Sequence, residues 1–117
     1  MNILQWLTLV FSLAVVMSSA GKSAAKDVIE DQHVGKTEQV ILAEFGKPKS
    51  TTTVAAKELG DELRRAVREK YFARRPNTQV RELYYKDKKG ETIFWLTEKY
   101  GKWVVVTDIW IAPGVQF

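Results

Sequence analysis

Three segments rich in β-branched and aromatic residues occupy the second half of the chain and constrain its fold more than any other feature. They run from Gln79 to Lys86, from Thr92 to Lys99 and from Lys102 to Ile111. The turn sequence DKKG at 87–90 separates the first two segments, and Tyr100-Gly101 separates the last two. Short strands joined by tight turns pair antiparallel with their chain neighbours. The sequence therefore predicts a three-stranded antiparallel β-meander.

Side-chain alternation along these strands predicts two unequal faces of the sheet. The first face is expected to form the core beneath the helices, and it collects Leu83, Tyr85, Phe94, Leu96, Trp103, Val105, Ile109 and Ile111. The second face collects Tyr84, Ile93, Trp95, Val104, Val106 and Trp110 among polar residues. A register slip of one residue would exchange the two faces. Exposed aromatic patches mark interaction surfaces. We therefore expect a free second face whose partner-binding residues are Tyr84, Trp95, Val104 and Trp110.

Two helices are expected before the strands. Within Gly35–Pro48, Thr37 is suited to N-cap a helix of about two turns, and Gly46 and Pro48 are suited to end it. A second helix is expected from Val54 to Ala73, where apolar residues recur every four positions and Gly60 weakens the pattern. The predicted fold class is α+β, with two N-terminal helices packed on the three-stranded antiparallel meander.

The first twenty residues resemble a signal peptide rather than part of the fold. The apolar run from Ile3 to Met17 has the length of a signal-peptide core, and small residues follow it up to Ala20. A second cleavage site would follow Ala25, and the alternatives are an uncleaved membrane anchor and a buried core helix. The expected organisation is a signal peptide at 1–20, a flexible leader at 21–33 and a single domain at 34–117. We expect no stable membrane anchor after cleavage.

Composition and motif spacing argue against catalysis. The chain has no cysteine, which excludes disulfides, thiolate metal sites and cysteine nucleophiles. Gly35-Lys36-Thr37 is not a P-loop, because Glu30 occupies the position where that motif requires glycine. His33 is the only histidine, and no neighbouring acid and nucleophile accompany it in the sequence. We expect neither enzymatic activity, nor a cofactor, nor a metal site.

The arginines of the second predicted helix offer an alternative function. Arg64, Arg68 and Arg75 could bind an anionic polymer or a membrane surface. The chain's net charge of +4 is compatible with an anionic partner. A solvated helix face balanced by nearby carboxylates explains the same pattern. Export would make nucleic acid an unlikely partner.

The motif at 35–48 resembles the signature of the SmpA/OmlA (BamE-like) domain family. The matching positions are Gly35, Thr37, Ile41, Phe45, Gly46 and Pro48. The resemblance implies helices packed on a three-stranded antiparallel sheet, an architecture similar to β-lactamase-inhibitor-protein-like domains. Members of that family in the barrel-assembly machinery carry a lipid-bearing cysteine after the signal peptide, and this chain has none.

Together these features predict an exported, non-catalytic domain of the bacterial cell envelope, periplasmic or secreted. It would bind another exported or envelope protein as an assembly accessory, a scaffold or an inhibitor-like protein. A homodimer that buries the aromatic face is the second interpretation, and anion binding through the arginines is the third.

Overall fold

The computed structural model describes residues 27–115 of the chain. In chain order the elements are β1 (Val28–Glu30), α3 (Glu38–Phe45), β2 (Ser50–Ala55), the 3-10 turn η1 (Ala56–Glu58), α4 (Glu62–Tyr71), β3 (Gln79–Asp87), β4 (Gly90–Lys99) and β5 (Lys102–Ile111). The expected signal peptide at 1–20 lies outside the described residues. No helix between residues 27 and 115 is both long enough and apolar enough to cross a membrane.

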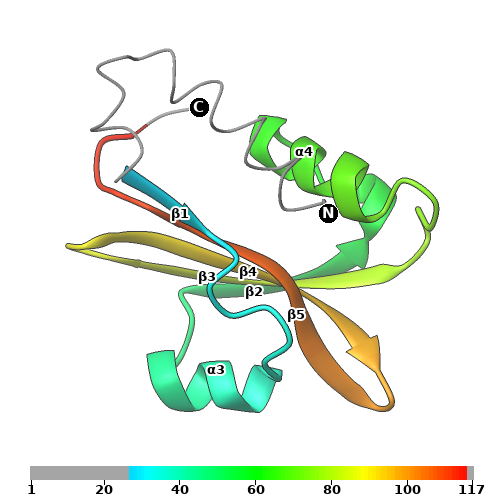
Figure 1. Cartoon of the computed structure of the whole chain (residues 1–117), viewed down its shortest axis with the longest axis horizontal. Coiled ribbons are helices and arrows are strands. Elements are labelled where there is room, and N and C mark those ends of the chain that lie inside the picture. Colours follow the sequence, from blue (N-terminus) through cyan, green and yellow to red (C-terminus); the bar gives the residue numbers. More distant parts are fainter. Residues whose placement is uncertain (1–26, 116–117) are drawn as a thin grey trace.

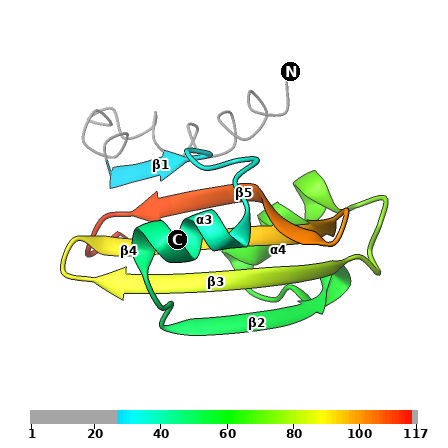
Figure 2. The same cartoon turned by 90° about the horizontal axis from the view of Figure 1, so that it is seen from below.

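All strands belong to one five-stranded antiparallel sheet with the order β1-β5-β4-β3-β2. The two helices cover opposite faces of this sheet, α4 on one side and α3 on the other (Figures 1 and 2). The general α+β class is confirmed. The predicted architecture of two helices on a three-stranded meander is wrong, because β1 and β2 extend the meander at both edges.

The helix α3 forms where its capping residues predict it. The Val40 N–H donates to the Thr37 hydroxyl at 3.4 Å, and the Gly46 N–H donates to the Leu42 carbonyl at 2.9 Å. Gly46 has a φ of +83°, a conformation that favours glycine. Ile41 is fully buried and anchors the helix on the sheet. Its core cluster also contains Leu83, Phe94, Leu96 and Val105.

The second helix is shorter than the sequence pattern predicts. Residues Val54 and Ala55 end β2 rather than begin a helix, and η1 follows them. Helix α4 begins only after Gly60, where the Asp61 carboxylate accepts the Arg64 backbone N–H at 2.9 Å. An N-cap carboxylate of this kind stabilises a helix start, because it satisfies a free backbone N–H of the first turn. The predicted helix from Val54 to Ala73 is therefore wrong in its first part.

The predicted assignment of the two faces is confirmed up to Val105, but a β-bulge in β5 overturns it for Ile109, Trp110 and Ile111. Trp95 pairs with Thr107 and Leu96 pairs with Val105, so Val106 is an extra residue in the ladder. Beyond the bulge, every β5 side chain changes face relative to an uninterrupted strand. Ile109 and Ile111 therefore join the core cluster under α4 rather than the one under α3. That second cluster comprises Ala56, Leu59, Val67, Phe72, Val80, Ile93, Trp95, Ile109 and Ile111.

The prediction of a free aromatic face is also wrong, because helices cover both faces of the sheet. Trp95 is 1% exposed beneath α4, and Phe94 is fully buried beneath α3. Residues 28–30 of the expected leader form β1 and pair with β5 from Val28 opposite Ile111 to Glu30 opposite Ile109.

Candidate functional site

The four predicted partner-binding residues do not form one surface. Trp95 lies in the core, and its indole N–H donates to the Glu82 carboxylate at 2.9 Å. Tyr84 is half-buried against the same core beside α4. Val104 is half-buried and forms a β-bridge with Thr37, the residue that caps α3. Trp110 follows the bulge and lies among residues from the α3 side.

The predicted arginine cluster is also dispersed. The Arg64 guanidinium forms a bidentate pair with Glu82, with N–O distances of 2.7 and 2.6 Å, and a further contact with Asp61 at 2.6 Å. The hydrogen bond and ion pair with Glu82 raise the pKa of Arg64. Arg68 donates to the Leu59 carbonyl at 2.5 Å. Of these three arginines, Arg75 alone is exposed, in the loop after α4. Two of the three arginines thus hold the domain together rather than face an anion.

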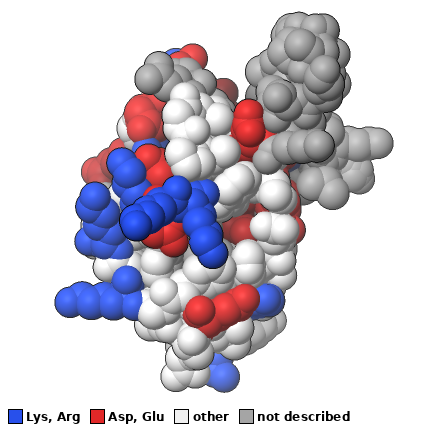
Figure 3. Space-filling model, turned by 90° about the vertical axis from the view of Figure 1, so that its left-hand side faces the viewer, with Lys and Arg blue, Asp and Glu red and all other residues white. Residues whose placement is uncertain are grey.

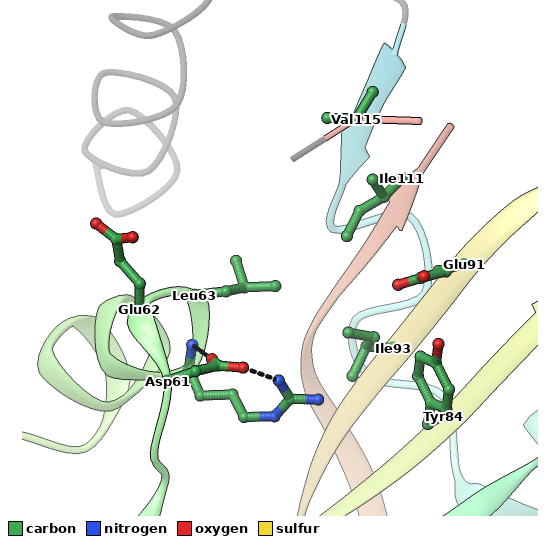
Figure 4. Close-up of a pocket in the computed structure, with 9 residues that line it drawn as sticks. Asp61, Glu62, Leu63, Tyr84, Glu91, Ile93, Ile111 and Val115 are labelled. Carbon is green, nitrogen blue, oxygen red and sulfur yellow. Dashed lines mark hydrogen bonds and ion pairs between the residues drawn. The ribbon is translucent and has the colours of Figure 1, made fainter. Parts of the chain in front are cut away.

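A groove of about 490 Å³ separates the start of α4 from the sheet (Figure 4). Leu63, Ile93, Ile111 and Val115 form its apolar walls. Its polar lining carries three carboxylates, those of Asp61, Glu62 and Glu91, beside the paired Arg64 and the Tyr84 hydroxyl. Burial and the nearby Glu91 raise the pKa of Tyr84. This groove is acidic apart from an arginine that is already neutralised, so it does not suit an anionic ligand.

A second and larger pocket, of about 600 Å³, lies at the end of the β3–β4 hairpin. We call it the lysine pocket and define it by Phe45, Lys47, Lys49, Tyr85, Lys86, Asp87, Lys89, Gly90, Thr92 and Trp110. Four of its ten residues are lysines and three are aromatic. They come from three places in the chain: the end of α3 with its connection to β2, the β3–β4 hairpin, and β5. Basic side chains gather on this end of the molecule (Figure 3).

The aromatic side of the lysine pocket is held in place by local contacts. Phe45 and Tyr85 are 5.5 Å apart between ring centroids, and the Tyr85 hydroxyl donates to the Gly46 carbonyl at 2.7 Å. Burial and the nearby Glu38 raise the pKa of Tyr85, so its hydroxyl keeps the proton of this bond. Gly90 lies close beneath Trp110, because a Cβ there would be 3.0 Å from the indole nitrogen. The pocket is therefore built into the fold rather than formed by loose side chains.

The charge of the lysine pocket is only partly balanced. Lys86 is 3.8 Å from Glu91, a weak surface pair. The Asp87 carboxylate accepts the backbone N–H of Lys89 at 2.7 Å, as in a tight turn. Within residues 27–115, Lys47, Lys49 and Lys89 form no ion pair with a carboxylate. Three ammonium groups thus remain for an anionic ligand beside an apolar surface.

His33 and Asp108 form a polar contact that the sequence does not reveal. The His33 ring Nδ1 is 2.9 Å from the Asp108 carboxylate, which also accepts the His33 backbone N–H at 3.1 Å. The two residues are 75 positions apart, so only the pairing of β1 with β5 brings them together. The ring packs edge-on against Phe45 and Phe94, each at 5.3 Å. This contact fastens the chain after β1 to the sheet.

Two half-buried acidic residues, Glu30 and Asp31, precede His33 in the chain. The Thr107 hydroxyl donates to Asp31 at 2.5 Å, and the Tyr71 hydroxyl donates to the same carboxylate at 3.5 Å. One carboxylate oxygen of Glu30 is buried with no hydrogen-bond partner among residues 27–115. Burial, and secondarily Asp31, raises the pKa of Glu30 to about 8, while Lys70 opposes the shift. The same part of the chain holds no cluster of His, Cys, Asp and Glu suited to a metal ion.

Comparison of the chain with protein-family models, with curated proteins and with solved structures finds no match. The resemblance of residues 35–48 to the SmpA/OmlA domain therefore stays a prediction.

Proposed function

We propose that this protein is a non-catalytic binding domain that holds an acidic segment of a partner protein in the lysine pocket. The observation that carries the proposal is that three lysines, which form no ion pair among residues 27–115, lie beside the aromatic groups of Phe45, Tyr85 and Trp110. Lysine ammonium groups attract carboxylates, and tyrosine and tryptophan are enriched among the residues that contribute most to binding energy at interfaces. A segment with carboxylates on either side of an apolar or aromatic residue suits both features.

The setting we propose is the bacterial cell envelope, with export directed by the N-terminal apolar run. The support is the pattern of residues 3–20, an apolar run followed by small residues. A role as an assembly accessory, a scaffold or an inhibitor-like protein is consistent with a domain that binds and does not catalyse. The His33–Asp108 pair is used for structure, and no nucleophile is hydrogen-bonded to His33 among residues 27–115.

The test is a binding measurement with a defined probe, the acetylated and amidated peptide Asp-Glu-Trp-Glu-Asp. The variant carries Lys47→Glu and Lys89→Glu, which reverse two charges of the pocket. The matched control carries Lys99→Glu and Lys102→Glu in the β4–β5 hairpin, where both lysines are exposed. Both variants change the net charge equally, so a difference between them reports position rather than total charge.

We expect the pocket variant to weaken binding by about tenfold or more and the control to weaken it by no more than about twofold. Raising the salt concentration should weaken binding to the native protein, because exposed charges are screened. Equal losses in the two variants would show that the peptide responds only to net charge, and this would refute the pocket as the site.

A further inference from the structure

One long edge of the sheet is open. Strand β2 is the last in the sheet order, and among residues 27–115 it pairs only with β3. Its residues 50–53, with the sequence STTT, are all exposed. The strand contains no charged residue and no proline, although natural proteins use both to protect open edges from pairing. Threonine and valine also favour extended structure. The edge therefore lacks the features that prevent pairing with another strand.

The backbone of β2 presents hydrogen-bonding groups to this open side. The Ala56 N–H donates inward to the Thr78 carbonyl at 2.8 Å. In an antiparallel strand, alternate residues direct their N–H and C=O groups to opposite sides. Thr52 and Val54 therefore point their backbone groups toward β3, whereas Thr51 and Thr53 point theirs away from it. No strand between residues 27 and 115 pairs with these outward groups.

Cationic residues stand at both ends of the open edge. Lys47 and Lys49 directly precede β2 and also line the lysine pocket. Lys57 follows the strand within η1, and its backbone N–H donates to the Pro76 carbonyl, which places exposed Arg75 nearby. An occupant of the edge thus meets a neutral centre flanked by positive charge.

We propose that β2 binds an extended segment of a partner protein as a sixth strand, with acidic residues at both ends of that segment. This inference rests on the proposed function for one of those ends, because a segment paired with β2 would extend to Lys47 and Lys49 of the lysine pocket. Backbone hydrogen bonds provide the attraction along the strand, and the flanking charges select the partner.

The same charges disfavour a second copy of this chain on the edge. Two β2 strands paired antiparallel about Thr53 would bring Lys49 of each copy toward the end of the other copy's β2, where Lys57 lies in η1. Like charges that face each other destabilise a strand pair, so an acidic segment fits the edge better than a second protomer does in that register.

The experiment begins with selection from a display library of random twelve-residue peptides against the full chain. The selected peptides should have β-branched residues at every second position and Asp or Glu near both ends. One of them is then synthesised, and its affinity is measured for the native protein, Thr51→Pro and Thr51→Val. Proline removes the outward N–H of Thr51 without touching a β2–β3 hydrogen bond, and valine keeps that N–H while removing the hydroxyl.

We expect Thr51→Pro to weaken peptide binding by about tenfold or more and Thr51→Val by no more than about twofold. If Thr51→Pro does not fold, the native protein is tested instead against two versions of the peptide, each methylated on alternate backbone nitrogens. One version carries the methyl groups on the odd positions and the other on the even positions, and one of the two should fail to bind. Any of three results would overturn the proposal. The proline and valine variants could bind the peptide with equal affinity, all methylated peptides could bind, or the library could yield no binder.

The lysine-pocket variant separates the two proposals. Peptide binding could be weakened by the Lys47→Glu, Lys89→Glu variant and not by Thr51→Pro. That result would keep the proposed function and overturn strand addition. Loss in Thr51→Pro alone would support strand addition and overturn the lysine pocket as its continuation. A concentration-dependent dimer of the native protein that Thr51→Pro abolishes would assign the edge to a second copy and overturn an acidic segment as its occupant.

Discussion

Replacing Trp95 by alanine should destabilise the domain severely, although a sequence reading places this residue on an exposed face. The side chain is 1% exposed and packs in the core beneath α4. Loss of a buried tryptophan of this kind costs about 3 to 5 kcal/mol of unfolding free energy, because a large cavity remains. Glu82 keeps its bidentate contact with Arg64, so the cavity provides most of the cost. A small domain has only about 5 to 15 kcal/mol in total.

Two variants serve as controls in urea unfolding followed by far-ultraviolet circular dichroism. Trp95→Phe keeps an aromatic ring but loses the N–H donor to Glu82, and we expect it to cost about 1 to 3 kcal/mol. Trp110→Ala removes a half-buried ring of the lysine pocket and should cost about 1 kcal/mol. A Trp95→Ala variant that is no less stable than Trp110→Ala would refute the packing described here and the register that produces it.

Three further stability changes follow from other parts of the structure. The pKa of Glu30 is raised above its value in the unfolded chain, so the free energy of unfolding should fall as the pH rises from about 4.5 to about 8. Glu30→Gln should flatten this fall and add about 1 to 2 kcal/mol of unfolding free energy at pH 8, a figure reduced for solvent screening of a partly exposed group. Urea unfolding at several pH values measures both effects. Gly90→Ala should cost more than about 2 kcal/mol in the same assay, because φ is +133° and the new Cβ would meet the Ile111 carbonyl; an unchanged midpoint would contradict the close approach. Asp108→Ala should lower the melting temperature by several degrees, because the His33 backbone N–H and ring Nδ1 both lose their partner, at a cost of about 1 to 3 kcal/mol of unfolding free energy. Calorimetry that finds no change in melting temperature would show that the contact does not stabilise the fold.

Local signals in the sequence predict local structure well. Thr37 and Gly46 mark both ends of α3, and the structure confirms the helix between them. Tyr100 and Gly101 have φ values of +52° and +80°, and they form the predicted two-residue turn between β4 and β5. Each of these features depends on the conformational preference of one or two neighbouring residues, so a single sequence is sufficient to find it.

Features that depend on distant residues are missed. The bulge at Val106 leaves no mark in the alternation of β5, yet it moves Ile109 to the other face of the sheet. The run at 50–55 has strand-forming residues, which could have indicated β2, but the strand is defined by its pairing with β3. A three-residue strand such as β1 has too few positions to show a pattern.

The candidate site illustrates the same limit. Trp110 is the one predicted contact residue that lines the lysine pocket. The sequence shows the lysines of the β3–β4 turn, but it does not show that the connection after α3 brings Lys47 and Lys49 to the same place. Phe45, named in the sequence only as a position of the 35–48 motif, is 36% exposed at the pocket. Fold topology, and not local pattern, assembles the site.

The most direct test of the central claim is to map where the acidic peptide Asp-Glu-Trp-Glu-Asp binds, using ¹⁵N-labelled protein and amide chemical shifts. The lysine pocket predicts that the largest shifts arise at the Trp110 indole N–H and at the backbone amides of Lys49, Lys89 and Gly90. It predicts little change at Leu63 and Glu62, which line the acidic groove beside α4. Largest shifts in that groove, or small shifts spread evenly over all exposed lysines, would contradict the account.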